Sequence, residues 1–205
     1  VNGTLVGEHK GGYDPFSFDV TPFLKKSGKQ TLKVKVMDAT DNSLQPRGKQ
    51  CFINRSIWYT PVSGIWQTVW LEPVAPAHIE NYYVVSDIDN GTMSFEVESS
   101  ASEGDVVKVA VLEGGEGYSA ETPASKVLAE AVVENGKAVV KLDKVNTWSP
   151  DAPYLYGVKV TLLRNGKVVD AVDGYTAMRK ISIVKDKTPN KYRRMALNNE
   201  PLFQF

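Results

Sequence analysis

Asn-Gly pairs between short apolar segments constrain the fold of this chain more than any other feature. They occur at residues 90–91, 135–136 and 165–166. Both residue types tolerate the positive φ values that a two-residue type I′ turn requires, so each pair predicts a β-hairpin. The clearest of the three is the last, because valines and leucines alternate along the segments on both sides of it. The chain is therefore expected to contain several antiparallel strands.

Side-chain periodicity extends this expectation to the whole chain. Residues 31–37 alternate strictly, which predicts a strand with Leu32, Val34 and Val36 facing a core. No segment keeps helical periodicity with caps over three turns, and in residues 124–134, which come nearest, the valines favour a strand. Short strands with turn signals about every 8 to 12 residues are typical of β-sandwiches. The predicted fold class is all-β.

Composition excludes several kinds of partner. The chain has 205 residues, enough for one large or two ordinary domains, and 24 Lys and Arg residues balance 24 Asp and Glu residues. We therefore expect no nucleic-acid and no membrane partner. The single cysteine, Cys51, cannot form an internal disulfide and is expected to be a buried, inert thiol. Because disulfide-free chains occur both in the cytosol and among secreted bacterial enzymes, the compartment stays open; we favour the bacterial periplasm or secretion over the cytoplasm.

Two boundaries divide the chain into three parts. Prolines in residues 73–77 break the preceding ladder and stiffen a linker. A polar, proline-broken connector follows Ile183. The expected parts are a first domain over residues 1–74, a β-sandwich over residues 77–183, and a linker over residues 184–205 that ends in a further apolar segment with an Asn-Asn turn.

Sequence motifs in all three parts resemble family 2 glycoside hydrolases of the β-galactosidase and β-glucuronidase type. Residues 148–156 (Trp-Ser-Pro-Asp-Ala-Pro-Tyr-Leu-Tyr) and 174–181 (Gly-Tyr-Thr-Ala-Met-Arg-Lys-Ile) resemble the end of that family's immunoglobulin-like domain. Residues 1–21 and 63–72 (Ser-Gly-Ile-Trp-Gln-Thr-Val-Trp-Leu-Glu) resemble its sugar-binding jelly roll, which is galactose-binding-like. The resemblance implies a partial jelly roll followed by an immunoglobulin-like β-sandwich.

The same resemblance implies that this chain does not cleave sugars by itself. Family 2 enzymes are retaining glycosidases, which need two carboxyl groups about 5 to 5.5 Å apart. In the family both are glutamates of a catalytic barrel, and residues 197–205 resemble only its beginning. The expected function is the non-catalytic front of a glycoside hydrolase, bracing the barrel and acting on carbohydrate only through the parent enzyme.

The first domain resembles only the second half of the family's jelly roll. A sandwich cut along its sequence exposes apolar sheet at a cost of about 25 cal/mol per Å². We expect the amino terminus to be artificial. Either another chain supplies the missing strands, or contacts in a crystal or a homo-oligomer cover the exposed face.

The loop over residues 41–60 is the candidate substrate site. It combines polar donors with flat rings, a mixture suited to sugar hydroxyls and to the apolar face of a sugar ring. A long connection that only packs against a neighbouring domain is the alternative. In the family this loop reaches the active site, but the aspartate that touches substrate in several members corresponds to Trp58 here, so the accepted sugar stays open. The candidate binding residues are Arg47, Lys49, Gln50, Arg55, Trp58 and Tyr59.

Other chemistries find little support. The acidic pairs at residues 38 and 41, 87 and 89, and 113 and 116 lie in turn-rich segments and are expected to be turn formers, so no catalytic residue is predicted. His9 and His78 are the only histidines, too few for a metal site, and no cofactor is expected. Two alternatives of other classes stay open: a stand-alone carbohydrate-binding module, and an adhesion-like pair of sandwiches.

Overall fold

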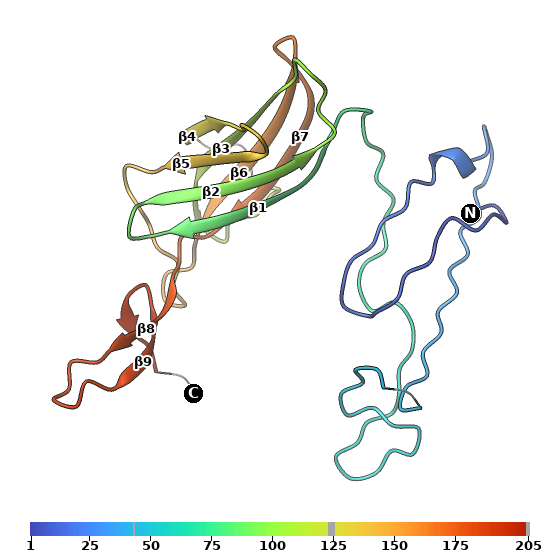
Figure 1. Ribbon diagram of the computed structural model, residues 1–205, viewed down its shortest axis with the longest axis horizontal. Coiled ribbons are helices and arrows are strands. Elements are labelled where there is room, and N and C mark those ends of the chain that lie inside the picture. The colour runs from blue at the N-terminus through green and yellow to red at the C-terminus, as the bar shows by residue number, and fades with distance from the viewer. Residues whose placement is uncertain (43, 123–125, 204–205) are drawn as a thin grey trace. The chain divides into compact units, whose positions relative to one another are not determined.

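The computed structural model describes residues 1–42, 44–122 and 126–203, and its regular structure is almost entirely antiparallel β-sheet (Figure 1). The predicted all-β fold class is confirmed. The chain divides into two compact units, Val1–Leu71 and Glu72–Phe205. The elements are η1 (Thr21–Phe23), β1 (Ile79–Asp87), β2 (Thr92–Ser99), β3 (Val106–Glu116), β4 (Val127–Val132), β5 (Lys137–Lys141), β6 (Tyr154–Arg164), β7 (Lys167–Thr176), β8 (Ile181–Lys185), β9 (Arg193–Leu197) and β10 (Glu200–Pro201).

Strands β1 to β7 form an immunoglobulin-like β-sandwich. One sheet has the order β1-β2-β5 and the other has the order β4-β3-β6-β7, and every neighbouring pair is antiparallel. Inward-facing residues alternate along β2, β3 and β6, as two sheets that cover each other's apolar faces require. The largest fully buried side chains are Tyr156, Phe95, Met93, Leu162, Met178, Val109, Val111, Val140, Val158 and Val160.

The three Asn-Gly pairs meet three different outcomes. Asn165 and Gly166 both have positive φ, and they join β6 to β7 in the predicted two-residue hairpin. Asn135 and Gly136 also take positive φ, but β4 and β5 belong to opposite sheets, so this turn carries the chain across the sandwich. Glu134 and Lys137 pair across this turn through backbone hydrogen bonds of 2.8 and 3.0 Å, so the predicted two-residue hairpin forms, but it ends after this one pair. A turn fixes the local backbone direction without choosing the strand that the next segment pairs with.

The first pair lies in a longer loop than the pattern predicts. The register pairs Asp87 with Thr92, so residues 88–91 form the connection between β1 and β2. The Asp87 carboxylate accepts hydrogen bonds from the backbone N–H groups of residues 89 and 90 and from the Asn90 side chain. These bonds stabilise a wider turn in place of the two-residue one.

Residues 124–134, whose periodicity came nearest to that of a helix, contain a strand. Residues 127–132 form β4 at an edge of the four-stranded sheet. Ala124 and Ser125, at the beginning of that segment, lie outside the described residues. The preference of branched side chains for extended backbone therefore outweighs the weak helical spacing.

After the sandwich, β8, β9 and β10 form a small sheet of their own. Their order is β10-β9-β8, and β8 runs through Ile183, after which the sequence suggested a boundary. The connector over residues 186–192 is the loop between β8 and β9. Asn198 and Asn199 both have positive φ and form the predicted Asn-Asn turn between β9 and β10.

The first unit lacks β-strands among its described residues. Its regular element is the short 3-10 helix η1, which begins with proline in its first turn. The strand predicted over residues 31–37 does not form, and Leu32, Val34 and Val36 are 63%, 53% and 48% exposed. A strand is held by hydrogen bonds to a neighbouring strand, and none of the described segments pairs with this one along its length. The prediction that these side chains face a core is therefore wrong for this structure.

Candidate functional site

A backbone bridge between Gln50 and Tyr59 closes the second half of the candidate loop over residues 41–60. The Tyr59 N–H donates to the Lys49 carbonyl at 2.9 Å, and the Cys51 N–H donates to the Tyr59 carbonyl at 3.2 Å. Ser43, within the loop, lies outside the described residues. The bridge brings three of the six candidate residues, namely Lys49, Gln50 and Tyr59, to one place in the fold.

A second group gathers around Arg47. Its guanidinium lies 3.5 Å from the Asp41 carboxylate and 5.9 Å from the centre of the Trp58 ring. The same carboxylate accepts the Phe52 N–H at 3.3 Å. An arginine over an aromatic face and beside a carboxylate is held by cation–π and charge interactions, so Arg47 and Trp58 form one local surface.

Two further candidates keep their side-chain donors available. Lys49 and Arg55 are exposed, and within the described parts of the chain neither side chain makes a hydrogen bond or an ion pair. The Arg55 carbonyl accepts the Trp58 N–H at 3.1 Å, and Ser56 between them has a positive φ of 54°. This tight turn places the Arg55 backbone next to Trp58.

Gln50, a candidate sugar-binding residue, also makes a hydrogen bond that holds the loop together. Its Oε1 accepts the Val62 N–H at 3.1 Å, which ties the segment just after the loop to the bridge. Trp58 and Tyr59 remain 37% and 65% exposed, so both rings are accessible for stacking. Cys51, expected to be buried, is only partly covered because it lies within this open loop.

The shifted pKa values of the described carboxyl groups do not have the direction that a general acid needs. A general acid needs a raised pKa, which burial or a second carboxylate provides. Among the described carboxyl groups, those with a shifted pKa all shift downward. At Asp38 the Thr40 N–H and the Ser63 hydroxyl lower the pKa, and at Asp87 the side chain and backbone of Asn90 lower it. These two residues are turn formers, as predicted. Glu113 and Glu116 instead lie in strand β3, so the prediction that they form a turn is wrong.

Asp89 has a role that its turn-rich surroundings did not indicate. Its carboxylate pairs with the Lys180 ammonium and accepts a hydrogen bond from Asn199 Nδ2 at 2.7 Å. Lys180 first, and then Asn199, hold its pKa below the usual value. The partners lie about 90 and 110 residues away, so local patterns in the sequence carried no signal for this contact.

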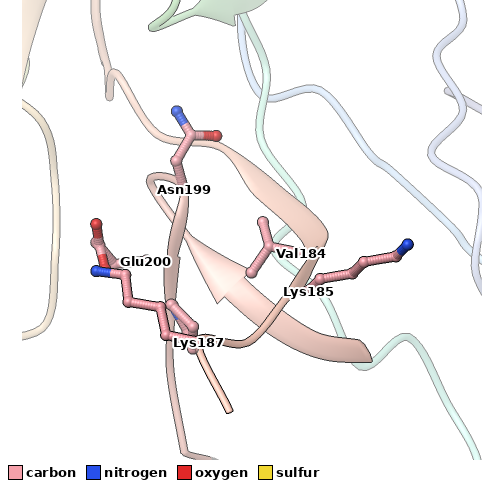
Figure 2. A pocket seen from close by; sticks show the side chains of 6 residues that line it. Val184, Lys185, Lys187, Asn199 and Glu200 are labelled. Atoms are coloured by element: carbon pink, nitrogen blue, oxygen red, sulfur yellow. The ribbon is translucent and has the colours of Figure 1, made fainter. Parts of the chain in front are cut away.

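Two open hollows lie on described residues of the second unit, and neither gathers a pair of acids. Figure 2 shows the first, a hollow of 340 Å³ on the small sheet lined by Val184, Lys185, Lys187, Asn199, Glu200 and Pro201. The second has 530 Å³ and lies beside β1 and the end of β7, with Tyr83, Trp148, Tyr175 and Arg179 in its lining. Glu200 is the single carboxylate of these two linings.

The described residues also contain no group of three metal-ligating side chains and no helix long and apolar enough to cross a membrane. His78 Nδ1 lies 2.8 Å from the Ala75 carbonyl and 3.1 Å from the Ser100 hydroxyl. His9 stacks on Phe16 with ring centres 4.3 Å apart. Each histidine therefore has a local packing or hydrogen-bonding role.

The sequence profile of "Glycosyl hydrolases family 2" matches residues 77–179. This range begins just before β1 and ends after the buried Met178, so it contains all seven strands of the sandwich. The chain belongs to glycosyl hydrolases family 2. The motif residues 148–156 and most of the 174–181 motif lie inside the matched range, so the family resemblance of the sequence is confirmed.

Curated relatives agree with this family assignment. A β-galactosidase of Thermoanaerobacter pseudethanolicus is 29% identical over 209 residues, which cover 98% of this chain and 26% of the relative. The β-galactosidase BoGH2A of Bacteroides ovatus is 29% identical over 197 residues, covering 89% of this chain and 21% of the relative. A solved structure of a β-glucuronidase from Ruminococcus gnavus with D-glucuronic acid aligns with a TM-score of 0.47 and 16% identity, covering 62% of this chain and 19% of that chain. The chain thus spans about a quarter of the length of these family 2 relatives.

Proposed function

We propose that this chain is a non-catalytic β-sandwich portion of a retaining glycoside hydrolase acting on β-galactosides or β-glucuronides. The observation that carries the proposal is the family 2 match over the whole sandwich. In this proposal the bond-breaking glutamates belong to a barrel elsewhere in a longer parent protein, and the sandwich braces that barrel. The relatives, which are about four to five times as long as the part that this chain matches, are consistent with such a parent.

Residues 1–74 are proposed to be part of the sugar-binding jelly roll, followed by the sandwich over residues 77–183 and the connection over residues 184–205. The exposed, alternating side chains of residues 31–37 support the first assignment. Leaving such apolar surface in water costs about 25 cal/mol per Å², so strands from the parent protein or from a second copy are expected to cover it.

The loop over residues 41–60 is proposed to contribute to the rim of the parent's sugar site. Trp58 and Tyr59 offer exposed rings for the apolar face of a sugar. Lys49 and Arg55 offer donors that no other described side chain uses, and Arg47 supports the Trp58 ring. Gln50 connects this surface to the loop's closing bridge.

The isolated chain is expected to release no nitrophenol from p-nitrophenyl β-D-galactoside or β-D-glucuronide. A loop that completes a neighbour's site should also bind these sugars very weakly alone, so calorimetric titration is expected to show no measurable heat of binding. Turnover that copurifies with the chain would overturn the proposal. A clear binding isotherm without turnover would instead favour a stand-alone carbohydrate-binding module.

In the parent enzyme, Trp58→Ala is expected to raise KM for these substrates about 2- to 10-fold, because an aromatic contact contributes roughly 0.5–1.5 kcal/mol beyond its buried area. Steady-state kinetics measure the change. Tyr83→Ala, which removes an exposed ring from strand β1, is the matched control and should leave KM unchanged. Equal kinetics for the Trp58 variant and the native enzyme would remove the loop from the sugar site.

A further inference from the structure

The chain leaves the sandwich through a connection that is held by strand β1 and by the segment that precedes β6. Met178, two residues after β7, is fully buried in the sandwich core. Its carbonyl accepts the Trp148 N–H at 2.9 Å. The next carbonyl, of Arg179, accepts the Ser86 hydroxyl from β1 at 3.2 Å. The backbone that leads into β8 is therefore anchored on two sides.

The Asn-Asn turn between β9 and β10 returns to this anchored connection. Asn198 Oδ1 accepts the Lys180 N–H at 3.0 Å, and the Asn198 N–H donates to the Lys180 carbonyl at 2.8 Å. Asn198 Nδ2 donates to the Trp148 carbonyl at 2.9 Å. One side chain thus joins the turn to the connection and to the segment that precedes β6.

The second asparagine reaches a different part of the sandwich. Asn199 Nδ2 donates to Asp89 Oδ1 at 2.7 Å, and the other oxygen of this carboxylate pairs with the Lys180 ammonium. Asp89 lies in the loop between β1 and β2. We call Asp89, Lys180, Asn198 and Asn199 the asparagine latch.

Little apolar burial holds the small sheet to the sandwich besides this latch. Among the described residues from 181 onward, only Ala196 and Leu197 are buried. Ile181 and Ile183 of β8 are 63% and 70% exposed, so their side of the sheet is open. The polar contacts must therefore supply much of the docking free energy.

The turn does not require asparagine side chains for its own conformation. Glycine takes positive φ at least as readily, and Asn-Gly serves that purpose at the β6–β7 hairpin. Glycine lacks the side-chain amide of asparagine, which can donate and accept hydrogen bonds at the same time. At residues 198 and 199, the amides bond to the sandwich rather than to the turn itself.

We propose that the asparagine latch is a positioning device, which fixes the β8–β10 sheet on the end of the sandwich and sets the direction in which the chain continues after β10. Its partners are all within this chain, so it does not depend on the sugar or on the proposed barrel. Asp89 is then a positioning residue that acts through Lys180 and Asn199.

The test is hydrogen exchange of the full chain, read separately for the small sheet and for the sandwich. Asn198→Gly with Asn199→Gly keeps the left-handed turn and removes both amides. Exchange of the β9 amides and of the Glu200 amide is expected to accelerate about 10-fold or more, while β3 and β6 keep their protection. Asn165→Gly is the matched control, because it changes a left-handed turn asparagine that makes no side-chain hydrogen bond with the described residues. Unchanged protection of the β9 and Glu200 amides would overturn the proposal.

Asp89→Ala separates the latch from a local effect on the turn. This change lies in another loop, yet it should loosen the same amides, and combining it with Asn199→Gly should add less than the sum of the two effects. Asp89→Asn, which keeps the shape and loses the charge, should give an intermediate acceleration and serves if the alanine variant folds poorly. Strictly additive effects, or acceleration confined to the β1–β2 loop, would show that the residues do not act together.

Discussion

Replacing Tyr156 with alanine is expected to lower the free energy of unfolding by about 3–5 kcal/mol, the range for removing a large aromatic side chain from a core. Tyr156 is fully buried on β6 and packs edge-on against Tyr154 with ring centres 4.9 Å apart. Burial, together with the nearby Tyr154, raises the pKa of its hydroxyl, which therefore stays neutral and available for hydrogen bonding. Urea denaturation monitored by tryptophan fluorescence measures the loss.

The hydroxyl has a separate contribution. It accepts the Asn146 N–H at 2.6 Å from the segment that leads into β6, an arrangement that resembles the tyrosine corner of immunoglobulin-like domains. Tyr156→Phe keeps the ring and leaves that N–H without its partner, at a cost of about 1–3 kcal/mol. Tyr175→Phe, at an exposed ring on β7, is the control and should change stability little. A Tyr156→Phe variant as stable as the native chain would exclude the corner as a stabilising contact.

Gly114→Ala is expected to destabilise the sandwich by about 3 kcal/mol, lowering the midpoint of thermal unfolding by roughly 10 °C or more. A Cβ atom at Gly114 would lie 1.7 Å from the Leu155 carbonyl oxygen and 2.7 Å from its carbon. These are backbone atoms of the neighbouring strand β6, so no side-chain rotation can relieve the overlap. The β3–β6 ladder would have to separate at the irregularity between Leu112 and Gly115.

The neighbouring glycine supplies the control for this substitution. A Cβ atom at Gly115 meets nothing within 4 Å, and its φ is not in the left-handed region. Gly115→Ala should therefore be nearly neutral in differential scanning calorimetry. Similar midpoints for the two alanine variants would mean that β3 and β6 do not approach as closely as described.

Local sequence patterns predicted the parts of the fold that depend on local chemistry. Asn165 and Gly166 determine a hairpin because the turn and the alternation on both sides agree. The turn at Asn135 and Gly136 has the predicted conformation, yet the pairing of β5 with β2 depends on burying Ala138 and Val140 with the other sheet. That choice is made by tertiary packing, which alternation alone does not encode.

The unit Val1–Leu71 shows a second limit of prediction from local sequence patterns, because here a strand pattern forms no strand. Leu32, Val34 and Val36 have the alternation of a strand, but without a neighbouring backbone the pattern has nothing to pair with. For the candidate loop, the sequence supplied the residue types, whereas the closing bridge and the Arg47–Trp58 contact emerged only from the structure. The contact of Asp89 with Asn199 spans 110 residues and could not be found from spacing.

The buried Met178 gives the chain an uneven sensitivity to oxidants. Its sulfur is enclosed with the core, whereas Met37 is 92% exposed. Peroxide reaches a thioether through solvent and converts it to a polar sulfoxide. A chain that is oxidised at Met178 before it folds would have to bury the polar sulfoxide in the connection between β7 and β8. Oxidation during synthesis would therefore disturb the folding of this connection. Oxidation of the folded protein would instead modify exposed methionines such as Met37.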